Sequence, residues 1–106
     1  MIIAYANKDI ENICNDQQYA SRKYPEQICK KLHELMIKLD SYDSIHYFYT
    51  LKVLKKYRCH ELKGNKNGII SLSLGKKYRM ELKVKIEKID GKDVIIILEV
   101  SNHYGD

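Results

Sequence analysis

Apolar and charged residues alternate strictly between positions 77 and 87 of the chain. The apolar positions are Tyr78, Met80, Leu82, Val84 and Ile86, and every residue between them is Lys, Arg or Glu. A period of two is typical of an antiparallel strand that buries one face. The pattern therefore predicts a half-buried strand with a charged second face.

Turn signals divide the neighbouring segments into further strands. Residues 57–62 and 69–74 are expected to be strands on either side of Asn67-Gly68, a pair that favours a tight turn because both residues tolerate positive φ. Gly75-Lys76 indicates a second turn, and Asp90-Gly91 indicates a hairpin. The following run, DVIIILEV at 93–100, is almost entirely apolar, which fits a central strand buried on both faces.

The N-terminal part predicts a short strand followed by helices. Residues 1–6 are mostly apolar, and Asn7 is placed to cap a helix that begins at Lys8. Residues 16–23 are polar and have only a weak helical rhythm. Pro25 suits the first turn of a longer helix, where its missing N–H is not needed. This helix ends within 40–43 and has one apolar stripe, made of Ile28, Leu32, Leu35, Met36 and Leu39.

Residues 45–54 fit two structures. The β propensity of Tyr47, Phe48 and Tyr49 favours a strand, whereas Ser44 could cap a short helix. With either choice, the order of elements predicts one α+β domain covering residues 1–106. In this fold an N-terminal strand and two helices pack on an antiparallel sheet of about four to five strands.

Charge is unevenly distributed along the chain. The window from Lys52 to Lys85 holds 11 Lys and Arg residues against Glu61 and Glu81, so it carries +9 while the remainder carries −4. A basic half is typical of a protein that binds a polyanion, most simply a nucleic acid, although a solvated lysine-rich surface has the same composition. On the first interpretation, the expected nucleic-acid contacts are Arg58, Lys66, Lys76, Lys77 and Asn102.

Cysteine usage and hydropathy bear on cofactors and location. Cys14, Cys29 and Cys59 are odd in number and widely spaced, without a CxxC pair, which argues against a disulfide framework and a zinc site. We therefore expect no metal or other cofactor. The N-terminus does not resemble a signal peptide, and no apolar run approaches the length of a membrane span. The expectation is a soluble cytoplasmic protein that does not act at a membrane.

Antiparallel strands joined by short turns would bring several polar residues to one face or end of the sheet. The six candidates are His60, Lys63, Arg79, Asn102, His103 and Tyr104. A general base would remove the proton of an RNA 2′-OH, Lys and Arg would stabilise the pentacoordinate phosphate, and His or Tyr would protonate the leaving 5′-oxygen. The imidazole, phenol, ammonium and guanidinium groups of these residues therefore fit metal-free cleavage of RNA.

The stretch 57–82 resembles the HigB branch of the RelE toxin superfamily. The similarity is carried by HELKGNKNG at 60–68, ISL at 70–72 and KYRM at 77–80, together with the tail NHY at 102–104. The resemblance implies a RelE-like fold and a ribosome-dependent mRNA endoribonuclease, the toxin of a type II toxin–antitoxin module, which inhibits translation. It also implies three partners: mRNA on the ribosome, ribosomal RNA and a HigA-like helix-turn-helix antitoxin.

The family's roles carry over onto the matching residues. His60 would act as the base or contact the phosphate, and Lys63 and Arg79 would bind and stabilise the phosphate. The tail departs from the family's "DYH" pattern, because no alignment of it keeps the acidic residue. We take His103 as the preferred functional residue of the tail and Tyr104 as the second choice for the general acid.

Each of these residues also has a structural explanation. His60 could be a surface residue of its strand, and Lys63 could belong to an ordinary turn. Arg79 could pair with a glutamate on a neighbouring strand, and His103 could be solvated near the end of the chain. The other histidines and the aromatic residues 47–49 are expected to be structural.

Two further functions remain open on the same fold. Because the tail acid is missing, the chain could be a catalytically inactive module that binds RNA, the ribosome or an antitoxin. It could also serve only as a corepressor with a DNA-binding protein. Replacing His60 or His103 separates the enzyme from the binding module, since cleavage would be lost and binding kept.

Overall fold

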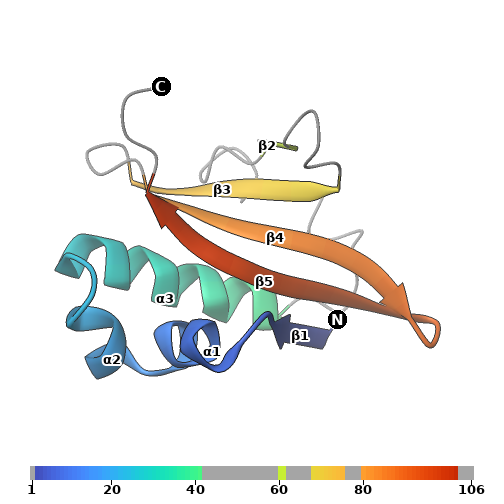
Figure 1. Cartoon of the computed structure of the whole chain (residues 1–106), viewed down its shortest axis with the longest axis horizontal. Coiled ribbons are helices and arrows are strands. Elements are labelled where there is room, and N and C mark those ends of the chain that lie inside the picture. The colour runs from blue at the N-terminus through green and yellow to red at the C-terminus, as the bar shows by residue number, and fades with distance from the viewer. Residues whose placement is uncertain (1, 42–59, 62–67, 76–79, 103–106) are drawn as a thin grey trace.

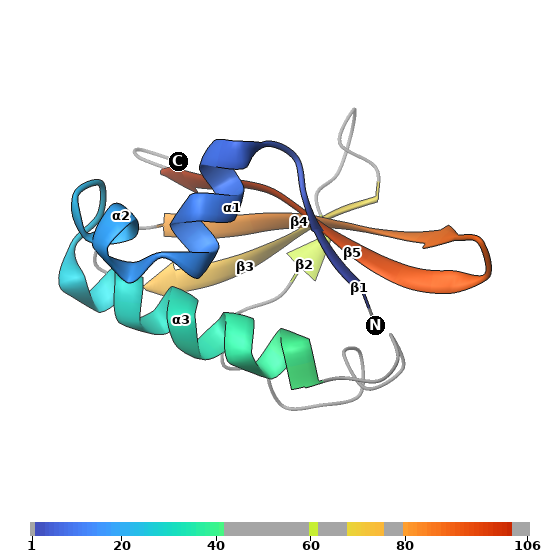
Figure 2. The ribbon, with the colours of Figure 1, turned by 90° about the horizontal axis from the view of Figure 1, so that it is seen from below.

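The computed structural model describes residues 2–41, 60–61, 68–75 and 80–102, which form a five-stranded sheet with three helices on one side (Figures 1 and 2). Residues 45–54, whose sequence fits two structures, lie outside the described residues. The elements in chain order are β1 (Ile2–Tyr5), α1 (Lys8–Asn15), α2 (Gln17–Ser21), α3 (Glu26–Ser41), β2 (His60–Glu61), β3 (Ile69–Gly75), β4 (Met80–Ile89) and β5 (Lys92–Asn102).

The strands lie in the order β1-β5-β4-β3-β2. Strands β2, β3, β4 and β5 pair with one another in antiparallel fashion, as the sequence predicts, and the α+β class is confirmed. The N-terminal strand differs, because β1 runs parallel to β5 with Ile2 opposite Val94. The sheet is therefore mixed. Parallel neighbours need a long connection, and here it contains all three helices and the other strands.

Side-chain caps separate the first two helices. The Oδ1 atom of Asn7 accepts a hydrogen bond from the N–H of Ile10 at 2.9 Å, which confirms the predicted start of α1. In the same way, Asp16 caps α2 by accepting from the N–H of Tyr19 at 3.1 Å. The sequence prediction of two helices missed α2, because five residues are too few to show a helical period.

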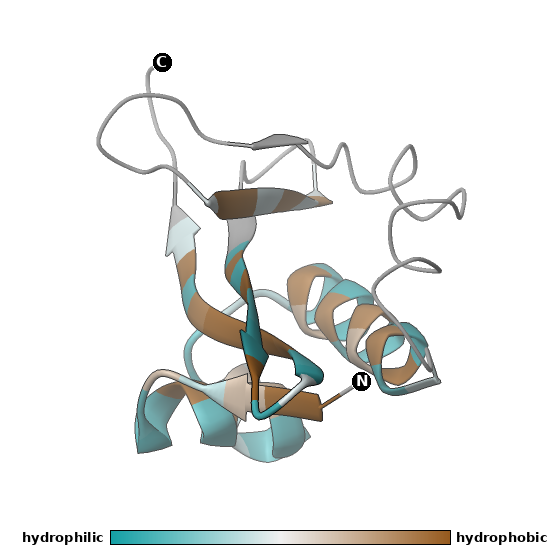
Figure 3. Ribbon diagram, turned by 90° about the vertical axis from the view of Figure 1, so that its right-hand side faces the viewer, coloured by the Kyte–Doolittle hydropathy of each residue, from teal (hydrophilic) through white to brown (hydrophobic). Residues whose placement is uncertain are grey.

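Helix α3 covers the sheet and carries the predicted apolar stripe. It begins directly after Pro25, whose carbonyl accepts hydrogen bonds from the amides of Ile28 and Cys29 at 3.0 and 3.1 Å. All five stripe residues are buried, and Figure 3 shows the alternation of apolar and polar positions along the helices. They pack with the helix-facing residues of the sheet, which include Ile70, Leu72, Leu74, Val84, Ile95 and Ile97. Burying a side chain of this size contributes about 1.5–3 kcal/mol.

A two-residue turn joins β4 to β5. Asp90 and Gly91 have φ values of 51° and 77°, and two positive values are the signature of the type I′ turn that hairpins favour. The predicted hairpin is confirmed. Strand β5 lies between β1 and β4, as expected for an internal strand, but its burial on both faces is incomplete, because Ile96 and Leu98 are only partly buried.

Candidate functional site

The sheet has a second face, turned away from the helices. In β3, Leu72 belongs to the helix-facing core, and in β4 so does Val84. Because successive side chains of a strand point to opposite faces, Ser71 and Lys83 belong to the other face. This polar face is where the sequence places its candidate chemistry.

Residues of four strands form one register row across the sheet. His60 of β2 pairs with Ser71 of β3, Ser71 pairs with Lys83 of β4, and Lys83 pairs with Glu99 of β5. Directly opposed residues of antiparallel strands have Cβ atoms about 4.5–5.5 Å apart. A second row, two residues further along, contains Ser73, Glu81 and Ser101.

Lys83 is buried although it belongs to the charged series of β4. Its side chain is 7% exposed, and its Nζ lies 3.1 Å from Oε1 of Glu99, a side chain that is 51% exposed. A buried ammonium is costly unless an anion accompanies it, and Glu99 provides that anion. The alternation predicts the face to which Lys83 belongs but carries no information on what covers that face, so its burial was not predicted.

Two serine hydroxyls on this face are buried and find no hydrogen-bond partner among the described residues. Within the described part of the chain, neither Oγ of Ser71 nor Oγ of Ser101 makes a hydrogen bond. Buried hydroxyls are paired in most proteins, and an unpaired one calls for an explanation. The sequence assigns no role to either serine, although Ser71 belongs to the ISL run, because their positions relative to Lys83 follow only from the strand register.

The candidate residues lie partly within the described structure. The predicted pairing of the last strand with the alternating strand is confirmed, and Met80 at the start of β4 pairs with Asn102 at the end of β5. Of the other candidates, His60 is described in β2. The remaining ones lie outside the described residues: Arg58, Lys63, Lys66, Lys76, Lys77, Arg79, His103 and Tyr104.

In the part of the chain that the structure describes, cavities lie on the helical side of the sheet, away from the polar face. One of about 450 Å³ is lined by residues of α2, of α3 (including Cys29) and of the segment between them (Tyr24), and one of about 370 Å³ lies between β1, α1 and α3. Among the described residues, no group of three His, Cys, Asp or Glu side chains could hold a metal ion. Within the same ranges, the helices are all too short or too polar to cross a membrane.

No family model and no curated protein matches the sequence. The fold, however, matches solved structures over nearly the whole chain. A YoeB/ParE toxin from Agrobacterium tumefaciens superposes with a TM-score of 0.60 at 12% identity, covering 98% of this chain and 100% of that chain. A YoeB dimer and a YoeB–YefM complex, both from Staphylococcus aureus, give TM-scores of 0.57 and 0.55 at 19% identity, each covering 98% of both chains.

These similarities establish the fold of the chain. It has the fold of the YoeB/ParE toxins, so the expected RelE-like fold class is confirmed. None of the three structures is a HigB protein.

Proposed function

We propose that this chain is the toxin of a type II toxin–antitoxin module and inhibits translation by cleaving mRNA on the ribosome. The observation that carries the proposal is a fold shared over 98% of the chain with structures of YoeB/ParE toxins. The +9 charge between Lys52 and Lys85 gives this fold the electrostatic character of an RNA-binding protein. The HELKGNKNG and KYRM runs, which resemble the HigB branch, support that branch in particular.

Cleavage proceeds by attack of the 2′-OH on the adjacent phosphate, without a metal ion. His60 is the base or a phosphate contact, Lys63 and Arg79 stabilise the phosphate, and His103 or Tyr104 protonates the leaving oxygen. Met80 and Asn102, which are the described neighbours of Arg79 and His103 in the chain, are register partners at the ends of β4 and β5, which supports the proposal. Acid–base catalysis of this kind contributes on the order of 10²–10⁴-fold.

The proposed partners are mRNA, ribosomal RNA and an antitoxin. Arg58, Lys66, Lys76, Lys77 and Asn102 contact the RNA. One similar structure is a YoeB–YefM complex, which supports an antitoxin partner for this chain. A HigA-like helix-turn-helix protein fills that role if the HigB assignment holds.

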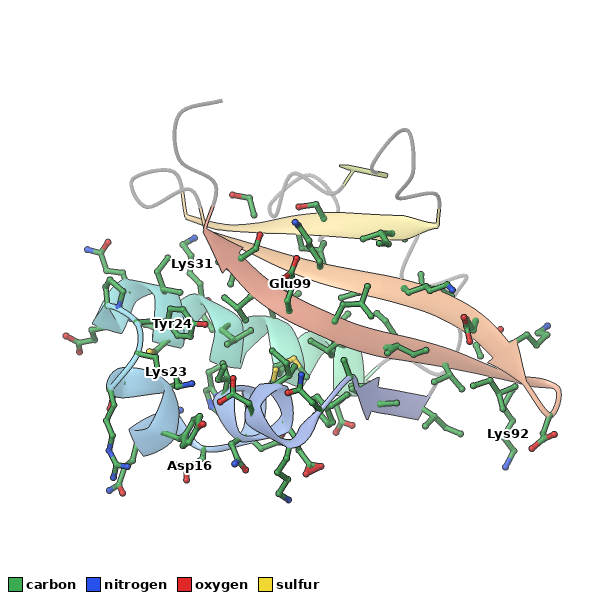
Figure 4. All side chains as sticks on the ribbon, in the orientation of Figure 1. Asp16, Lys23, Tyr24, Lys31, Lys92 and Glu99 are labelled. Carbon is green, nitrogen blue, oxygen red and sulfur yellow. The ribbon has the colours of Figure 1, made fainter. Side chains whose placement is uncertain are left out.

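Induced expression in a bacterial host tests the proposal. The wild-type chain should arrest growth and produce new mRNA 5′ ends within translated frames, and Arg79→Ala should abolish both effects. The matched control is Lys92→Ala, which removes one positive charge from the exposed hairpin end of the sheet, outside the basic window (Figure 4). This variant should stay toxic.

Growth without arrest from a soluble product, with intact messages, would refute the nuclease. Sedimentation of the purified protein with ribosomes would then distinguish the inactive binding module from a chain with no RNA function. The tail of this chain, which has Asn102 where an acidic residue is common in the family, is the feature that favours that second candidate.

A further inference from the structure

The polar face holds hydrogen-bonding capacity that the described residues leave unused. Ser71 is fully buried and Ser101 has a buried Oγ, and neither hydroxyl has a partner within the described ranges. A buried hydroxyl without a partner indicates a place for a water, an ion or a ligand atom.

Both hydroxyls flank Lys83. Ser71 lies directly opposite Lys83 on β3, and Ser101 lies two residues beyond Glu99, the register partner of Lys83 on β5. Such direct and diagonal neighbours have Cβ atoms about 5 and 7–8 Å apart, so the three side chains belong to one cluster. Ser71 and Ser101 lie on opposite sides of Lys83, so an oxyanion beside Lys83 meets the ammonium and the hydroxyl on one side of it, which together supply up to four hydrogen-bond donors.

The carboxylate of Glu99 offsets the positive charge of Lys83. Its Oε1 lies 3.1 Å from Nζ of Lys83, but the two side chains differ in exposure, at 51% for Glu99 and 7% for Lys83. Glu99, labelled on β5 in Figure 4, can turn toward solvent, whereas Lys83 is enclosed. Because the buried ammonium of Lys83 needs an anion beside it, Glu99 can leave only when another anion takes its place, and a phosphate oxygen satisfies this requirement.

We propose that Lys83, Ser71 and Ser101 form a phosphate subsite for bound RNA, and that Glu99 occupies this subsite in the free protein. Lys83 is an RNA-binding residue, and Glu99 is an internal competitor that an RNA phosphate displaces. The inference rests on the proposed RNA-directed function and adds residues to which the sequence motifs assign no role.

The salt dependence of RNA binding tests the subsite. We would measure affinity by fluorescence anisotropy with a 2′-O-methylated RNA, which cannot be cleaved by 2′-OH attack. Each contact with a phosphate of single-stranded nucleic acid adds about 0.7 to the slope of log K against log salt concentration. Lys83→Met should lower the slope by about 0.7, and Lys83→Arg, which keeps the charge, should retain it.

The same two strands provide a matched control. Lys88 pairs in register with Asp93, with Nζ and Oδ1 3.8 Å apart, and its side chain is 70% exposed at the hairpin end of the sheet. Lys88→Met removes a charge of the same kind and should leave the slope unchanged. Circular dichroism establishes that each variant is folded.

Glu99→Gln provides an independent readout if Lys83→Met does not fold. Removing the competitor leaves the buried ammonium of Lys83 without its anion, so RNA binding at low salt should tighten by about fivefold or more. An unchanged slope in folded Lys83→Met, or equal or weaker binding by Glu99→Gln, would overturn the subsite while leaving the toxin proposal intact. A wild-type chain that binds no RNA at any salt concentration would instead refute the proposed function itself.

Discussion

The carboxylate of Asp9 on α1 is held by Lys23, whose Nζ lies 2.8 Å from its Oδ1. The hydroxyl of Tyr19 on α2 donates to the same oxygen, and the Lys23 ammonium lies 5.0 Å from the centroid of the Tyr19 ring. The three side chains connect α1 to the segment that leads into α3. This small network keeps the two short helices in a fixed arrangement on the surface.

The network makes stability depend on pH at both extremes. The hydrogen bond with Lys23 and, to a smaller extent, the one with Tyr19 lower the pKa of Asp9 below 3.8. The stability that ionised Asp9 contributes is therefore present above that pH, and it is lost on acidification through the lowered pKa. The hydrogen bond with Asp9 raises the pKa of Lys23 above 10.5, so the same contact is lost again in strong alkali. The difference in unfolding free energy between wild type and Asp9→Asn should therefore be constant between these limits and shrink beyond both.

Chemical denaturation over a pH series measures this difference. Lys23→Met should remove the same pH dependence, and the double variant should lose no more than either single one. A difference that stays constant down to pH 2 would contradict the role of Asp9.

Two residues of α3 test the placement of the core. Leu35 is fully buried, whereas Ile37, two positions along, is 58% exposed. Leu35→Ala should lower the unfolding free energy by about 2–5 kcal/mol, because it leaves a cavity in the core. Ile37→Ala should change it by less than about 0.5 kcal/mol. Urea denaturation compares the two, and equal losses would show that α3 buries a different face.

The thiol of Cys14 should be unreactive in the folded protein. Burial raises its pKa from 9.0 to about 12, so almost no thiolate is present at pH 8. Mass spectrometry after iodoacetamide treatment should find Cys14 unmodified in the native state and modified in urea. Rapid native modification at a rate matching the urea sample would contradict its burial.

The hairpin turn requires a residue that accepts positive φ. Gly91 has a φ of 77°, and a Cβ there would meet no heavy atom within 4 Å, so any effect of Gly91→Ala comes from the backbone alone. The left-handed region costs a residue with a Cβ about 1–2 kcal/mol, and the melting temperature should fall accordingly. Asp90→Asn should be tolerated, since Asn adopts the observed φ of 51° readily.

The sequence predicts most of this fold because its signals are local. The Asn7 cap, the stripe of α3, the alternation of β4 and the Asp90-Gly91 turn each lie within a few residues of the element they specify, and all are found in the structure. The parallel pairing of β1 with β5 is not local. No pattern near Ile2 indicates that its partner is Val94.

Some residues of the candidate site also follow from local sequence signals, whereas others follow only from strand pairing. Its motif residues can be read from sequence, because HELKG and KYRM are continuous runs. The Lys83–Glu99 pair could not, because Ser71, Lys83 and Glu99 meet only through the register of three strands. Leu98 is an extra residue in that register, since Lys83 pairs with Glu99 while Val84 pairs with Ile97, and simple alternation would have misplaced Glu99.

The position of β1 beside β5 also affects how the chain folds during its synthesis. Ile2 is synthesised before its partner Val94, which follows 92 residues later in the sequence. Contacts so distant in sequence form late and slow folding. Strand β1 therefore remains without this neighbour until β5 has been translated, so the parallel pair forms only after all the strands between them in the sequence have been made.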